Sequence, residues 1–254
     1  MRLAPRDNKV MDDRSVARGS SRLAHGWRLM NSVEAPRKTI NEFIRPAVRS
    51  VPSSMAHRLG SCRISLLPMA DSTVTSQWIE TNLGLEVCVT TSGWEEHDVA
   101  MELLLCLGQA LWGRLSANEL QAYWTLLDHE ILEGIGGEID EQAFEEKRSL
   151  LASRSRSRRR EQLDRYGCTS FAGTAAEYVH CLWHDVTIRT GPDHLPAPQQ
   201  RRRLELMARW FPPDCGYRLF PARGGPGRMR TEVSYGTAGG GKRRCVRHDI
   251  REGR

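Results

Sequence analysis

The strongest constraint on the fold of this chain is residues 94–115, a segment of helix length that is apolar nearly all round. Ser92 and Glu95 have the spacing of a capping box, so we expect a helix to begin there. A helix with so little polar surface must be buried on most of its sides. Its polar side chains form one narrow seam, made of Glu95, Asp98, Glu102 and Gln109. A buried carboxylate is costly without a partner, so this seam faces either water or other polar groups.

Strand-like segments precede this helix. Residues 63–67 and 85–90 have β-branched, alternating sequences typical of strands with one solvated face, and residues 76–80 are a weaker candidate. Helices follow it, with capping signals at Ser116 and at Asp140. The sequence therefore predicts an α+β fold, mostly helical, in which a small N-terminal sheet is followed by about five helices.

The later helices are expected at definite positions. Gly167 is expected to stop one of them, and Thr174 with Glu177 has the spacing of another capping box. Pro198 suits the first turn of the last helix. The expected helices after residue 115 cover 116–133, 140–166, 175–186 and 199–210, with a short helix at 39–48 and a closing strand at 217–220.

Charge and composition divide the chain into three parts. Residues 1–50 hold 11 Lys and Arg against 5 Asp and Glu, and residues 221–254 hold 9 against 3. Neither end shows a sustained hydrophobic period. We expect residues 1–50 to be a disordered or loosely attached basic segment, and residues 221–254 a disordered, basic, Gly-rich tail. Residues 51–220 then form a single globular α+β domain.

The basic charge belongs to the ends, because residues 51–220 carry 17 basic and 23 acidic side chains. A mildly acidic body does not favour nucleic-acid binding by the fold itself. The same region has no glycine-rich phosphate loop after a strand and no nucleophile elbow. One hypothesis is therefore a nucleic-acid-associated protein that acts through its basic tails.

Cysteine usage and hydropathy bear on location. Seven cysteines are scattered without a CxxC pair, which favours reduced thiols in the cytoplasm. The longest apolar run, residues 103–112, is too short to cross a bilayer, and no signal-peptide pattern follows the N-terminus. We expect a cytoplasmic protein with no membrane partner, whose partner is a protein or a small molecule.

Four metal-binding residue types share one face of the expected helix at 175–186. Glu177, His180, Cys181 and His184 stand at i, i+3, i+4 and i+7, within a stripe about 100° wide. Histidines four apart on a helix can bind one zinc ion, and Glu177 is placed to be a third ligand. The alternative is a solvated face, because the opposite face is apolar and Glu177 has a capping role.

The seam of the first helix is a candidate partner for this stripe. Pairing of Glu102 with His180 and His184 would join a carboxylate to two imidazoles, an arrangement suited to metal binding or acid–base chemistry. The alternative is that the seam faces water along one edge of the domain. His97 and His129 are expected to be surface histidines rather than ligands.

The order of strands, a buried helix and a later helix that carries an acid resembles the zincins, a metallopeptidase fold. Residues 105–112 resemble the active-site helix of that family, whose His-Glu-x-x-His motif is often followed by small and apolar residues. By that match Leu105 and Gln109 occupy the two zinc-histidine positions and Cys106 that of the general-base Glu, while Glu177 sits where some zincins place their third ligand. The resemblance covers roughly residues 55–220 and implies a zincin-like fold with a degenerate site, because neither Leu105 nor Cys106 keeps the required chemistry.

Two functional hypotheses follow for the folded body. The first is a zincin-like domain that has lost standard peptidase chemistry and acts as a binding or regulatory module. The second is a zinc-dependent hydrolase in which His180, His184 and Glu177 are metal ligands, and Glu102 or Glu177 is the catalytic carboxylate. The distance between the Glu102 seam and the two histidines separates a site from a solvated face.

Overall fold

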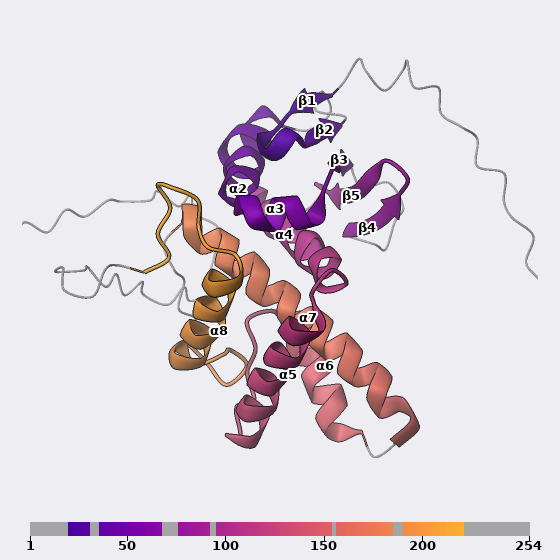
Figure 1. Cartoon of the computed structure of the whole chain (residues 1–254), viewed down its shortest axis with the longest axis vertical. Coiled ribbons are helices and arrows are strands. Elements are labelled where there is room, and N and C mark those ends of the chain that lie inside the picture. The colour runs from indigo at the N-terminus through magenta and orange to yellow at the C-terminus, as the bar shows by residue number, and fades with distance from the viewer. Residues whose placement is uncertain are drawn as a thin grey trace, which may run out of the picture.

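The structure is a computed structural model, and it describes residues 20–30, 36–67, 76–91, 95–153, 156–184 and 190–220. The described residues form the expected α+β fold, with one small N-terminal sheet followed by helices (Figure 1). None of the helices within these ranges is long and apolar enough to span a membrane. The helices after residue 115 extend away from the sheet, whereas those between residues 45 and 59 lie beside it, and α7 (Arg156–Trp183) runs through the middle of the helical part (Figure 1).

Within the described residues the sheet has five strands: β1 (Ser21–Arg22), β2 (Arg28–Met30), β3 (Cys62–Leu67), β4 (Ser76–Thr81) and β5 (Gly84–Thr90). Their order across the sheet is β1-β2-β3-β5-β4. The central pairs β2–β3 and β3–β5 are parallel, whereas β1 and β4 are antiparallel edge strands. The three strands expected from the sequence are therefore confirmed, as β3, β4 and β5.

The expectation of a disordered or loosely attached segment at residues 1–50 is wrong for 20–30 and 36–50. Trp27 and Leu29 are fully buried, and the Trp27 indole donates a hydrogen bond to the Gly60 carbonyl at 2.9 Å. The expected helix at 39–48 is present as a π-helical segment, η3 (Thr39–Ile44), that continues into α2 (Arg45–Ser50). Strands of two and three residues are too short to give a hydrophobic period, which is why the sequence did not reveal them. Residues 1–19 and 221–254 lie outside the described residues.

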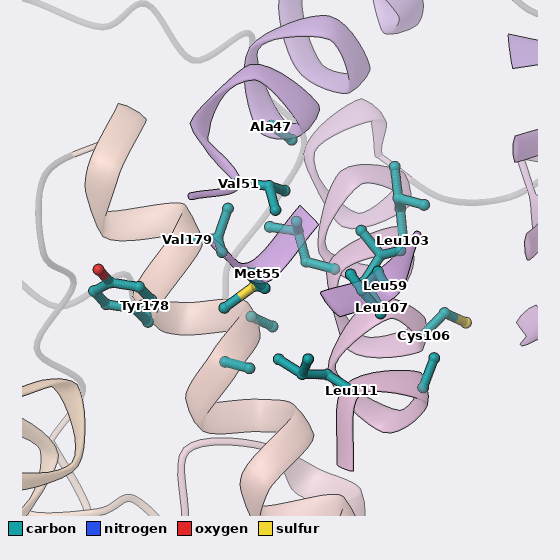
Figure 2. Close-up of a cluster of buried hydrophobic side chains, with 14 of the residues drawn as sticks. Ala47, Val51, Met55, Leu59, Leu103, Cys106, Leu107, Leu111, Tyr178 and Val179 are labelled. Atoms are coloured by element: carbon teal, nitrogen blue, oxygen red, sulfur yellow. The ribbon is translucent and has the colours of Figure 1, made fainter. Parts of the chain in front are cut away.

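The buried helix is α4 (Glu96–Trp112), which begins two residues later and ends three residues earlier than expected. Ser92 lies outside the described residues, and Glu95 precedes the helix with no side-chain cap. On the side that faces α7, an added Cβ at Gly108 would come within 2.8 Å of the Ala172 Cα. The two helices therefore approach closely because glycine and alanine meet at their crossing. Figure 2 shows the apolar cluster between them, in which Leu103, Leu107 and Leu111 of α4 face Val179 of α7.

The expected helix boundaries at Gly167 and Thr174 are wrong, because a single helix, α7 (Arg156–Trp183), runs through both. An added Cβ at Gly167 would lie 2.4 Å from the Trp124 ring, so this glycine makes room for an aromatic side chain instead of ending the helix. The Thr174 hydroxyl donates to the Ser170 carbonyl at 2.9 Å, a bond made in helix interiors. Glu177 therefore has no capping role.

The remaining helices begin mostly as the sequence predicts. Ser116 and Glu119 make the expected reciprocal capping box, and the Asp140 carboxylate accepts from the Gln142 and Ala143 amides. Residues 217–220 contain no strand. These elements are α3 (Ser53–Leu59), α5 (Ala117–Leu132), α6 (Glu141–Ala152) and α8 (Ala197–Trp210).

Candidate metal site

Three side chains near the end of α7 converge on one point. Glu177, His180 and Cys181 each offer one ligand atom, and these atoms lie within 4.8 Å of one another. The spacing i, i+3, i+4 places them on one face of the helix. All three residues are buried, at 8%, 6% and 5% exposure. Burial makes it costly for these polar groups to lack partners, and a bound cation is one partner that suits all three.

The distances fit a tetrahedral ion. The Glu177 Oε2 lies 3.6 Å from the His180 Nδ1, and the Glu177 Oε1 lies 3.4 Å from the Cys181 Sγ. Zinc bonds of about 2.1 Å to oxygen and nitrogen and about 2.3 Å to sulfur place tetrahedral ligand pairs about 3.4–3.6 Å apart. The two pairs lie at about this separation, each through a different oxygen of Glu177. All three ligand atoms lie within 4.8 Å of one another, so side-chain rotation would have to bring them onto one ion.

The two ring nitrogens of His180 have different surroundings. Its Nε2 lies 3.0 Å from the Nε2 of His97, at hydrogen-bond distance. Its Nδ1 is buried without a hydrogen-bond partner, although it points to within 3.6 Å of the Glu177 carboxylate. Most buried polar atoms are hydrogen-bonded. The Nδ1 is therefore the nitrogen that is available to a metal ion.

A second layer of contacts orients the carboxylate. The side-chain amide of Gln200, on α8, donates to the Glu177 Oε1 at 3.1 Å, and the Cys181 thiol donates to the same oxygen. Hydrogen bonds of this kind fix the orientation of metal-binding groups. Thus α8 holds Glu177 in place, and a metal ion would replace the thiol proton of Cys181.

The cluster adjoins a cavity of about 380 Å³ through Glu177. Carboxylates dominate its polar lining, and the lining includes no Lys or Arg among the described residues. Burial raises the pKa of one of them, Asp140. The carboxylate-bearing residues that line it are Asp98, Glu102, Glu138, Asp140, Glu141 and Glu177. A cavity of this composition attracts cations.

The polar seam of α4 meets two partners. Glu102 accepts a hydrogen bond from the Ser76 hydroxyl at 2.5 Å, and Gln109 accepts from the Trp78 indole at 3.2 Å, so β4 satisfies both. Glu102 nevertheless lines the same cavity as Glu177. The contact between α4 and His180 comes from His97. His97 is about one-third exposed, with a side-chain exposure of 36%, and it contacts His180 without belonging to the set of ligand atoms. His129 is exposed, as expected.

His184 lies just beyond the end of α7 and is exposed. Its ring centroid is 5.2 Å from that of His180 and 6.0 Å from that of His97, so the three imidazoles form one group. It is not part of the set of ligand atoms that lie within 4.8 Å of one another; Cys181 is. Cys181 belonged to the predicted stripe but not to the predicted ligand set, because a buried cysteine is more often a packing residue.

The positions matched to the zincin motif are dispersed over α4. Leu105 lines the cavity together with Glu177, whereas Gln109 is bonded to Trp78. Cys106 is buried, and burial raises the pKa of its thiol to about 11. A thiol that stays protonated at neutral pH is not a general base. Of the two basic ends, for which nucleic-acid binding was one hypothesis, residues 1–19, 31–35 and 221–254 lie outside the described residues.

Comparisons with protein-family models, with curated proteins and with solved structures returned no match.

Proposed function

We propose that this chain is a metal-binding protein that holds one divalent transition-metal ion, such as zinc, at Glu177, His180 and Cys181. The observation that carries the proposal is the His180 Nδ1, a buried ring nitrogen with no hydrogen-bond partner that faces a carboxylate and a thiol. Carboxylate, imidazole and thiolate are all zinc ligands. Three protein ligands leave a fourth position for water, a ligand or another side chain.

We further propose that the ion serves a zincin-like domain that works as a cytoplasmic binding or regulatory module. The element order supports this, since the strands, the buried α4 and the acid-bearing α7 follow one another as the resemblance implies. Leu105 and Gln109 offer no standard site. In this proposal the metal ion is bound by residues of α7 alone, instead of by the zincin motif positions on α4. The ion then lies beside the cavity that Leu105 and Glu177 line.

Metal analysis tests the proposal. The full chain, stripped with chelator and reloaded with zinc, is expected to retain about one equivalent after gel filtration. His180→Ala and Cys181→Ser should each retain far less, and His129→Ala, which alters an exposed histidine, should match wild type. With Co²⁺, wild type should show a thiolate-to-cobalt charge-transfer band that Cys181→Ser lacks. A folded wild-type protein that retains no zinc or cobalt contradicts the proposal.

A zinc-dependent hydrolase is the second candidate, and the cavity favours it. Glu102 lines the same cavity as Glu177, so a second carboxylate borders the space beside the proposed metal site. Glu102→Gln should then lower the zinc-dependent kcat on peptide or ester substrates by about 10²–10⁴-fold and leave the zinc content unchanged. Equal turnover by Glu102→Gln and wild type, or turnover that survives zinc removal, contradicts the hydrolase; the metal analysis is independent of this result.

A further inference from the structure

We propose that His97 of α4 is a positioning residue for the metal site, because it selects the tautomer of His180 that presents Nδ1 to the ion. This inference rests on the proposed metal site at Glu177, His180 and Cys181. His97 does not touch the ion; it acts through the 3.0 Å contact between the two Nε2 atoms. A residue on the buried helix thereby controls a site whose ligands all belong to α7.

The tautomer follows from the number of protons. A neutral imidazole carries one N–H, and a nitrogen that binds a metal carries none. If the His180 Nδ1 binds the ion, its Nε2 carries the hydrogen and donates it to His97. The His97 Nε2 is then the acceptor, so the hydrogen of that ring lies on Nδ1, 3.6 Å from the Asp98 Oδ1. A metal-binding histidine commonly donates its second N–H in this way, and the acceptor fixes both tautomer and ring orientation.

Packing holds His97 in the accepting position. Its ring meets the His180 ring nearly edge-on, with centroids 5.0 Å apart and an interplanar angle of 79°. Phe43 of η3 packs against it at 6.5 Å, and His184 at 6.0 Å. Groups from η3 and from the end of α7 therefore contact the ring, although 36% of the side chain stays exposed. These contacts restrict the ring and lower the entropy lost when the hydrogen bond is fixed.

The apoprotein does not need this proton arrangement. With two imidazole nitrogens at 3.0 Å, either ring can donate, and only one of the two directions leaves the His180 Nδ1 free of hydrogen. A metal ion on the His180 Nδ1 requires that direction, and the His97 Nε2 supplies the acceptor for it. His97 thus stabilises the tautomer of His180 that the metal-bound protein needs. Removal of His97 is therefore expected to weaken zinc binding by about 10–100-fold.

Substitutions that keep or remove the acceptor test the inference. Gln places its side-chain oxygen near the position of a histidine Nε2, whereas Asn places it near that of Nδ1. His97→Gln should therefore bind zinc with an affinity close to that of wild type, while His97→Ala and His97→Asn lose about 10–100-fold, measured by competition with a chelator of known affinity. His129→Ala is the control and should not change the affinity. Loss in all three His97 variants, including Gln, indicates a packing role and overturns the inference.

A spectroscopic signature separates orientation from packing. In long-range ¹H–¹⁵N spectra of the zinc-loaded protein, His180 should show a protonated Nε2 and a metal-bound Nδ1, and His97 an unprotonated Nε2. The opposite tautomer in His180, or an unchanged zinc affinity in His97→Ala, overturns this inference while the proposed metal site stands. A wild-type protein that binds no zinc overturns the proposed function, and this inference with it.

Discussion

Replacement of Arg203 by methionine is expected to lower the free energy of unfolding by about 3–5 kcal/mol. Arg203 of α8 is fully buried, and its guanidinium donates to the carboxylates of both Glu130 and Glu138, which are also fully buried. The guanidinium also donates to a third side chain, the Ser170 hydroxyl, at 2.8 Å. Methionine fills similar space but leaves two buried carboxylates without this cation, and that penalty exceeds the value of the lost hydrogen bonds.

Urea unfolding at neutral pH measures the effect. Arg202→Ala is the matched control, because Arg202 is the neighbouring residue on α8, is half exposed, and pairs with Glu133 at the surface. It should change stability by less than about 1 kcal/mol. Adding Glu130→Gln to Arg203→Met should recover part of the loss, since one stranded charge is removed. A loss in Arg203→Met no larger than that in Arg202→Ala contradicts the expectation.

This buried network also holds the candidate site together. Glu138 receives hydrogen bonds from Arg203, Lys147 and Tyr166, so one carboxylate joins α8, α6 and α7. Glu138 also lines the cavity beside Glu177. Because Arg203 anchors α8, it keeps Gln200 against Glu177. The network therefore supports the orientation of the Glu177 carboxylate from one turn away along α8.

The sequence predicts elements whose burial shows in their own composition. Residues 94–115 are apolar nearly all round, so α4 is recognisable without its partners. The long helix α7 is not recognisable as one helix, because Gly167 and the Thr174/Glu177 spacing are the usual marks of helix ends. In the structure Gly167 makes room for Trp124, and the Thr174 hydroxyl bonds within the helix, so the helix continues through both positions. The contact with Trp124 forms only when the chain is folded. The strands β1 and β2 escape detection because neither is long enough for a period.

Part of the candidate site could likewise be predicted from the sequence, and part could not. Glu177 and His180 share a helix face, so their proximity follows from spacing alone. His97 reaches His180 from 83 positions earlier in the chain, through the crossing of α4 and α7. Arg203 likewise sits in a run of arginines typical of an exposed helix, and only the packing of α8 turns that one side chain inward. Partners that meet through tertiary packing leave no local signal in a single sequence.

Acid is expected to weaken the fold through Glu138. Arg203, Lys147 and the Tyr166 hydroxyl outweigh burial and lower the pKa of Glu138 to about 2, from an ordinary value of 4.5. A carboxyl with a depressed pKa in the folded state contributes stability above the pKa it has in the unfolded chain. That stability is lost as the pH falls from 4.5 toward about 2. The shift corresponds to about 3 kcal/mol.

Urea unfolding measured across the acid range tests this assignment, with Tyr166→Phe as the diagnostic variant. The Tyr166 hydroxyl donates to the Glu138 Oε1 at 2.6 Å, so its removal should raise the pKa of Glu138 and move the loss of stability to higher pH. Glu119, whose pKa is also lowered to about 2 by Arg58 and Ser116, contributes to the same acid transition. Glu119→Gln removes that contribution and leaves the part that Tyr166→Phe shifts. An acid transition that is identical in wild type and Tyr166→Phe would mean that Glu138 does not set it. If the transition moves, Glu138 sets it. The carboxylate that joins α6, α7 and α8 beside the cavity then also determines the lowest pH at which the candidate site stays assembled.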